Sequence, residues 1–250
     1  MKIALFGLTG IKTGKHNLKD PRFDETHKLV EADKQTRAQV DVVGDDELLD
    51  ADAILVSVEG RANMILKDLE FVETRLGRDP QPAERAALEK IQALLEQEKL
   101  VFNSSLAPAD LQAVAAHSFV TAKPIVLAEP AEDPDALLLR AFAEAGWICF
   151  LTVGGKENRA WPIRKGITAW EAGGTIHTDI QKGFIRAEII SYADFVAAGG
   201  ETQAKRANKM RLETKQYVMH DYDLTNFRFN KWESSREKSS AFSKARRGIV

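Results

Sequence analysis

The sequence predicts an α/β protein with a parallel sheet, a helical hairpin inserted into that sheet, and a second, smaller α+β unit. Three observations support this fold class. Short apolar segments alternate with helix-type segments over about the first 155 residues, which is typical of a parallel sheet with helical crossovers. Two neighbouring helix-type segments share a seam of apolar residues. Beyond residue 155 the predicted elements become shorter, and the balance of charge changes sign.

The predicted sheet uses short apolar segments without the alternation of a half-exposed strand, so both of its faces are expected to be covered. These segments span residues 2–6, 38–43, 51–58, 123–130 and 146–155. Asp20 as a cap and Pro21 at the first helical position predict a helix that runs to about Ala32. A further helix is expected at about 133–145.

The predicted hairpin spans about residues 62–98. Its apolar positions recur every three or four residues, and they are Ile65, Leu69, Val72 and Leu76, then Leu88, Ile91 and Leu95. Gly77 ends the first helix, and Pro82 begins the second. A paired apolar seam of this kind leaves open a role as a protein-interaction adaptor.

After Gly155 the pattern is that of a small α+β domain. Strands are expected at 159–164, 183–190 and 226–230, and helices at 191–199 and 201–213. The predicted domains are residues 1–147 and 148–230, and about 80 residues suffice for a fragment of 148–230 to fold alone. The last segment, residues 231–250, has six Lys/Arg, two Glu and five Ser, and we expect a flexible basic tail.

Composition indicates a cytoplasmic protein. Hydrophobic residues make up 44% and charged residues 29% of the 250 residues, no apolar run is long enough to span a bilayer, and no export signal is visible. The lone Cys149 is expected to be a buried thiol. Residues 1–150 carry 17 Lys/Arg against 26 Asp/Glu, whereas residues 151–250 carry 18 against 11. The basic part is therefore expected to meet a polyanion.

The segment "GLTGIKTGKHN", residues 7–17, follows the first predicted strand where a phosphate-binding loop would stand. The pattern G-x-x-x-x-G-K-[ST] opens a helix whose N–H groups hold phosphate oxygens. Aligned on Gly14 and Lys15, the first glycine becomes Thr9 and the magnesium-binding hydroxyl becomes His16. The next predicted helix starts only at Pro21. We therefore interpret the loop as a degenerate P-loop.

The segments "RAWPIR", "IHTDIQKGFIRAE" and "NFRFN" closely resemble the C-terminal TGS domain of the YchF (Obg-like) ATPases. The resemblance covers about residues 147–230 and implies a β-grasp fold linked with RNA and ribosome binding. One departure is Tyr222, where the family has glycine in an Asp-Gly-Asp turn. If that turn needs a positive φ, Tyr222 is strained there.

The first half also resembles this family, with large internal deletions. "KIALFGLTGI" is similar to its first strand and phosphate loop, and Asp41-Val42-Val43-Gly44 to its Asp-x-x-Gly motif. The base-reading Asn is replaced by Glu129. The resemblance implies candidate nucleotide-binding residues, retained in a degenerate site: Gly7, Lys12, Gly14, Lys15, Asp41 and Gly44. ATP or GTP with Mg²⁺ is the cofactor only if nucleotide binding persists.

Cations and aromatic residues are interleaved in the second half, which suits RNA phosphates and stacked bases. The candidate RNA-binding residues are Arg159, Trp161, Arg164, Lys165, Lys182 and Arg186. A core position and a stacking position are both open for Trp161, whereas Trp170 is expected in the core. The sequence presents no catalytic grouping and no metal-ligand spacing among its five histidines.

The leading hypothesis is a truncated YchF-like protein that has lost hydrolysis and binds the ribosome or RNA, without DNA specificity and without a membrane. The alternatives are a residual ATP- or GTP-binding protein or weak ATPase, and an adaptor that uses the hairpin.

Overall fold

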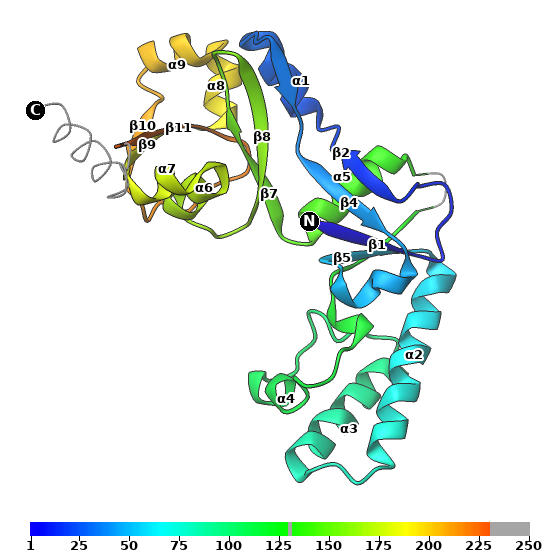
Figure 1. Cartoon of the computed structure of the whole chain (residues 1–250). Coiled ribbons are helices and arrows are strands. Elements are labelled where there is room, and N and C mark those ends of the chain that lie inside the picture. Colours follow the sequence, from blue (N-terminus) through cyan, green and yellow to red (C-terminus); the bar gives the residue numbers. More distant parts are fainter. Residues whose placement is uncertain (130–131, 231–250) are drawn as a thin grey trace, which may run out of the picture. The chain divides into compact units, whose positions relative to one another are not determined.

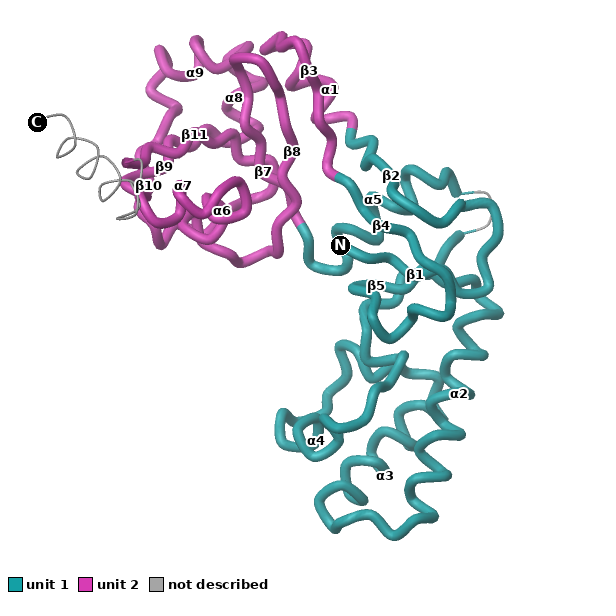
Figure 2. The backbone as a smooth tube through the Cα atoms, viewed as in Figure 1, with its two compact units in different colours: residues 1–20, 39–147 teal, residues 21–38, 148–250 magenta. Residues whose placement is uncertain are grey.

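The computed structural model describes residues 1–129 and 132–230, and the basic segment 231–250 lies outside this part (Figure 1). The chain forms two compact units (Figure 2). The first consists of residues 1–20 and 39–147. The second contains residues 21–38 as well as the chain that follows residue 147. A short piece from the N-terminal half is therefore part of the C-terminal unit.

The first unit is built on a mixed sheet of five strands in the order β2-β4-β1-β5-β6. These strands are β1 (Lys2–Phe6), β2 (Gly14–Asn17), β4 (Gln39–Val43), β5 (Ala53–Val56) and β6 (Ile125–Leu127). Neighbours among β4, β1, β5 and β6 run parallel, as predicted. The edge strand β2 runs antiparallel to β4 and was not predicted, so the expectation of a purely parallel sheet is wrong. Few apolar residues mark β2, because both its faces are largely exposed.

Two kinds of helix accompany this sheet. The predicted helix near residue 133 is α5 (Pro134–Glu144), whose cap residue Asp133 accepts from the N–H groups of Asp135 and Ala136. The 3₁₀ helix η1 (Asp45–Asp50) follows β4 and buries Leu48 against β1 and β4. Strand β5 is buried along its whole length, as its uniformly apolar sequence predicts.

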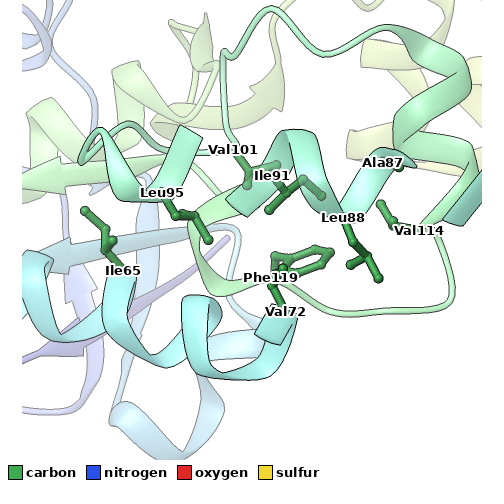
Figure 3. Packing of buried hydrophobic residues seen from close by; sticks show 9 residues of the cluster. All are labelled: Ile65, Val72, Ala87, Leu88, Ile91, Leu95, Val101, Val114 and Phe119. Atoms are coloured by element: carbon green, nitrogen blue, oxygen red, sulfur yellow. The ribbon is translucent and has the colours of Figure 1, made fainter. Parts of the chain in front are cut away.

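The hairpin consists of α2 (Val58–Leu76) and α3 (Pro82–Glu96), followed by α4 (Pro108–Ala113) and η2 (Val120–Ala122). Helix α2 begins four residues earlier than predicted, because Ser57 caps it by accepting from the N–H of Gly60. The predicted seam is confirmed. Its core joins both helices to the loop beyond them (Figure 3), and it contains Ile65, Val72, Ala87, Leu88, Ile91, Leu95, Val101, Val114 and Phe119.

A polar network closes the hairpin beside this core. The Glu84 carboxylate accepts from Nε and Nη2 of Arg75 at 2.6 and 3.0 Å, and Nε2 of His117 lies 2.7 Å from its Oε1. The hydrogen bonds from Arg75, and then from His117, lower the pKa of Glu84 to about 2. The network links the two helices to the segment that returns to the sheet.

We expect the stability that Glu84 contributes to depend on pH. Its pKa is lowered on folding, so the contribution is present above the usual value of 4.5 and is lost as the pH falls toward 2. In urea unfolding followed by circular dichroism, Glu84→Gln should therefore destabilise the protein most at pH 7 and progressively less at acidic pH. The exposed Glu96 on α3 gives the control, Glu96→Gln. A Glu84→Gln penalty that does not change down to pH 3 would contradict the role of the carboxylate.

The second unit is built on a mixed six-stranded sheet in the order β10-β9-β11-β7-β8-β3. The strands are β3 (Lys34–Thr36), β7 (Trp147–Thr152), β8 (Glu157–Arg164), β9 (Phe184–Ile190), β10 (Arg211–Glu213) and β11 (Asp223–Phe229). The helices are α1 (Pro21–Leu29), α6 (Ala169–Ile176), α7 (Thr178–Lys182), α8 (Tyr192–Ala198) and α9 (Glu201–Arg206). The predicted helix over 201–213 is therefore too long, because the chain leaves it at Arg206 and enters β10.

Residues 21–38 pack on the C-terminal strands. Strand β3 pairs in parallel with β8, and Phe23 and Thr26 of α1 are buried. The buried Asn158 side chain of β8 donates to the carbonyl of Val30, and its Nδ2 lies 3.0 Å from Nδ1 of His27. The expected division at residue 147 did not assign this segment to the C-terminal unit.

Tyr222 stands in the turn before β11 with a φ of +62°, the left-handed conformation that favours glycine. Its ring is buried, with the guanidinium of Arg22 3.8 Å from the ring centroid and Tyr192 edge-on at 5.7 Å. The tyrosine thus fills the space between α1 and α8, and this packing offsets the strain of its backbone.

Candidate functional site

The loop after β1 does not open a helix. Gly7, Gly10 and Gly14 have positive φ values of 63°, 100° and 117°, and they turn the chain back so that β2 pairs with β4. Lys12 and Lys15 are exposed, and the ring of His16 bonds to the carbonyl of Lys12 at 2.6 Å. The first α-helix that follows, α1, belongs to the other unit. The loop therefore lacks the converging N–H groups of a helix N-terminus.

Asp41 lies away from Gly7, where this loop begins, but beside Lys15, where it enters β2. In the parallel pair of β1 and β4 it stands opposite Lys2, at the start of β1, whereas the loop follows Phe6 at the other end. Four residues of extended strand separate these levels, roughly 13 Å. In the pair of β2 and β4, Asp41 stands opposite Lys15. Gly44 comes after β4 and caps η1. The structure therefore brings Gly14, Lys15 and Asp41 together across β2 and β4, whereas Gly7 follows the far end of β1.

A pocket of about 300 Å³ lies beside the loop. Its walls are Leu8, Thr9, Gly10 and Ile11 from the loop, and Ala128, Glu129, Glu132, Pro134 and Leu137 from the end of β6 and the start of α5. Glu132 is held by Arg140, whose Nη2 lies 2.7 Å from Oε2, and this hydrogen bond lowers the pKa of Glu132. The charged side chains of the wall are carboxylates, which oppose a polyphosphate.

The candidate RNA-binding residues lie on different faces of the C-terminal sheet. Arg159 and Trp161 are two residues apart on β8 and share the face that packs against α6. Arg186 on β9 adjoins Ala187, which is buried on that face, and stands opposite Arg228, so it points to the other face. Arg164 ends β8, Lys165 is exposed in the following turn, and Lys182 ends α7.

Trp161 is a half-buried packing residue. The guanidinium of Arg159 lies 3.9 Å from the centroid of its ring, and Phe150 lies nearly parallel to it at 6.3 Å. Its indole N–H donates to Oγ1 of Thr152 at 3.0 Å. These contacts favour a core position for Trp161. Arg159, the neighbouring candidate for RNA binding, is itself packed against the Trp161 ring.

Trp170 corrects the expectation of a core position, because 42% of its surface is exposed. Helix α6 buries Ala169, Ala172 and Gly173 instead. Small residues let this helix pack closely on the sheet, which turns the neighbouring indole toward solvent. The sequence did not indicate the exposure of Trp170, because tryptophan side chains are highly buried on average.

The described part of the chain presents neither a cluster of metal ligands nor a membrane-spanning helix. Within residues 1–129 and 132–230, no group of three or more His, Cys, Asp or Glu is arranged to hold a metal ion. None of the helices in these ranges has the length and apolar character needed to cross a membrane. Cys149 is buried and forms no disulfide, as predicted.

Comparison with known proteins connects this fold to one family. Residues 147–230 match the family model YchF-GTPase_C, described as a protein of unknown function (DUF933). The "Ribosome-binding ATPase YchF" of Bacillus subtilis (strain 168) is 46% identical over 96 residues, which are 38% of this chain and 26% of that protein. The protein of the same name from Escherichia coli O157:H7 is 54% identical over 81 residues, covering 32% and 22%.

"Obg-like ATPase 1" of Rattus norvegicus is 46% identical over 89 residues, which are 36% of this chain and 22% of that protein. The alignments thus span about a quarter of the length of these curated relatives. The structure of the Schizosaccharomyces pombe YchF GTPase is similar, with a TM-score of 0.70 at 18% identity, over 91% of this chain and 97% of that one. At this identity the likeness concerns the fold.

Proposed function

We propose that this chain, which belongs to the YchF family through residues 147–230, binds the ribosome or its RNA through the C-terminal unit and does not hydrolyse nucleotides. The observation that carries the proposal is the match of that unit to the family model. It is supported by relatives up to 54% identical that are named ribosome-binding ATPases.

The strand order supports a TGS domain of the β-grasp type. Without the added strand β3, the sheet has the order β8-β7-β11-β9-β10, with α6 packed on one face. Strands β7 and β8, the first two of this set along the chain, are neighbours. Strand β11, the last one in the described residues, lies beside β7. The exposed cations Arg164, Lys165, Lys182 and Arg186 then provide the phosphate contacts that position the domain on RNA. The proposal also includes the basic segment 231–250, which lies outside the described residues, as a further source of phosphate contacts.

The loop geometry supports the proposed loss of hydrolysis. A phosphate-binding loop needs a helix N-terminus for the phosphate oxygens and a hydroxyl for Mg²⁺. Here the chain forms strand β2 at Gly14–Asn17, and His16 stands where that hydroxyl would be. Asp41, which would hold the magnesium ion, lies at the opposite end of β1 from Gly7, the first glycine of the loop. These observations support a protein that lacks the catalytic arrangement for phosphoryl transfer.

The experiment is ribosome co-sedimentation of the purified full chain across a salt series. We expect binding that weakens with salt, with a log–log slope of about −3 to −4 if four cations contact phosphates. Lys182→Gln with Arg186→Gln should lower both the affinity and the slope. The double variant Lys12→Ala, Lys15→Ala changes the same number of charges in the other unit and should leave both unchanged. Binding that is absent at low salt would refute the proposal.

A residual nucleotide-binding function is the second candidate, favoured by the pocket beside the loop and by relatives named as ATPases. Equilibrium binding of labelled ATP and GTP, with and without Mg²⁺, separates the two. Our proposal expects no magnesium-dependent binding and no turnover above background. Hydrolysis that disappears in Lys12→Ala or Lys15→Ala would instead establish a working site.

A further inference from the structure

Trp170 has an exposed side chain and stands in the first turn of α6, which a capping box secures. Thr168 and Glu171 form a capping box at the start of α6, in which Oγ1 of Thr168 accepts from the N–H of Glu171. In return, Oε2 of Glu171 accepts from the N–H and hydroxyl of Thr168, each at 2.7 Å. The opposite face of α6 is buried in the core. The backbone that carries the indole is held in this way, so little backbone freedom is lost when another ring stacks on Trp170.

Hydrogen bonds bring a second segment, residues 215–219, against the start of α6. The N–H of Trp170 donates to the carbonyl of Lys215 at 3.3 Å, and the N–H of Ala169 donates to that of Tyr217 at 2.7 Å. Thr168 forms a bridge with Val218, 48% of whose surface is exposed. Val218, a second exposed apolar residue, therefore pairs with Thr168, two residues before Trp170, although it comes 50 residues later in the chain.

The preceding turn adds positive charge. The N–H of Ile167 donates to the carbonyl of Arg164 at 3.4 Å, and the N–H of Met219 donates to the carbonyl of Ile167 at 3.0 Å. The turn that carries Arg164 and Lys165 thus joins the same region. We call the group of Arg164, Lys165, Trp170, Lys215 and Val218 the Trp170 platform.

The chemistry of the platform is that of a single-strand nucleic-acid site. Three cations stand on the backbone segments that meet at the start of α6, which carries the exposed indole. The nearby carboxylate of Glu171 is engaged in the capping box, whose hydrogen bonds lower its pKa and keep it ionised. Cations that follow a backbone and an aromatic ring that stacks a base are the two parts of such a site. Trp161 does not offer this, since Arg159 lies over its ring.

We infer that Trp170 is a base-stacking residue for single-stranded RNA, with Lys165 and Lys215 contacting the adjacent phosphates. This inference rests on the proposed function, because it assigns a binding residue within the same C-terminal unit. It differs from the cation cluster predicted from sequence, in which Trp161 was the stacking candidate and neither Trp170 nor Lys215 took part.

The test is binding of the full chain to a fluorescently labelled single-stranded RNA of about 12 nucleotides, a length within the range of such sites, measured by anisotropy across a salt series. Trp170→Ala should weaken binding about 5- to 150-fold, the range for removing one stacked base. The salt slope should remain unchanged, because no charge is removed. Trp170→Phe should retain most of the affinity, since phenylalanine still stacks.

Two further variants separate charge from stacking. Lys165→Gln with Lys215→Gln should reduce the magnitude of the salt slope by about 1.4 for a single strand. Leu212→Ala removes another apolar side chain of the same unit, which is 54% exposed. It should change neither the affinity for the RNA nor the salt slope. Thermal melts should be the same for Trp170→Ala and the unmodified chain, because the indole is outside the core.

Each outcome decides between the two proposals. If the unmodified chain binds neither this RNA nor ribosomes, both the proposed function and the platform fail. If it binds and Trp170→Ala binds equally well, the platform alone fails. Weaker ribosome co-sedimentation of Trp170→Ala with unchanged RNA binding would assign Trp170 to a protein contact and would also overturn the platform.

Discussion

A fragment of residues 148–230 should show no cooperative thermal transition by itself, and it should gain one when a peptide of residues 21–38 is added. The sequence suggested that the fragment folds alone, since it contains its own strands and helices. The structure changes this expectation, because α1 and β3 complete the unit. Without them, the buried surface under α1 and one edge of the sheet would meet water.

The contacts that would be lost are apolar and polar. Phe23 is 1% exposed and Thr26 is fully buried, so both are core residues of the C-terminal unit. Removal of a buried phenylalanine alone costs about 3–5 kcal/mol, which is comparable to the stability of a small domain. Asn158 would also lose its bonds to Val30 and His27, and a hydrogen bond of this kind contributes about 0.5–1.5 kcal/mol.

Circular dichroism melts of the fragment, with and without the peptide, measure this effect. A peptide with Phe23→Ala is the matched control and should restore the transition weakly or not at all. The same cooperative melt and the same midpoint for the fragment with and without the peptide would show that residues 21–38 are dispensable for folding.

Replacement of Asp68 by alanine should lower the free energy of unfolding by about 2–4 kcal/mol, because it leaves buried N–H groups unpaired. Asp68 lies on α2 and is 4% exposed. Its two carboxylate oxygens accept from the N–H groups of Val120 at 3.2 Å and Thr121 at 2.8 Å. The side chain thereby joins the hairpin to η2, which leads into β6 of the sheet.

Asp68→Asn should also destabilise the protein, since its amide nitrogen is a donor and cannot accept from a second N–H. Burial raises the pKa of Asp68, so its ionised form is the less favourable one in the folded state. Its contribution is fully present below its unfolded pKa and decreases as the pH rises through the folded pKa. The penalty of Asp68→Asn relative to the unmodified chain should therefore be smaller at neutral pH than at pH 4.

Urea unfolding of the full chain measures both substitutions. Glu70→Ala, an exposed acidic residue on the same helix, removes a carboxylate without breaking a buried hydrogen bond and should change stability by less than about 0.5 kcal/mol. Equal stabilities of Asp68→Ala and Glu70→Ala would show that the bonds to Val120 and Thr121 contribute nothing.

The sequence by itself determined the elements whose physics is local or strongly periodic. The segments rich in apolar residues around β1, β4 and β5 predicted buried strands, and the hairpin seam predicted which faces of α2 and α3 meet. The sequence also predicted a helix at about 133–145, and α5 begins at Pro134 after the cap residue Asp133. The resemblance in residues 147–230 identified the family, because that segment is nearly uninterrupted.

Only the tertiary structure decided where the remaining polar segments belong. Strand β2 and residues 21–38 have too few apolar residues to reveal their partners, and those partners lie on strands far away in the sequence. The register of β4 against β1 separates Asp41 from Gly7, while the register of β2 against β4 places it opposite Lys15, and a register is a property of two strands rather than one. Trp170 is exposed because small residues fill the core face of α6, and Lys215 reaches it only through hydrogen bonds between distant segments. Such contacts depend on the packing of the whole unit, which no local pattern encodes.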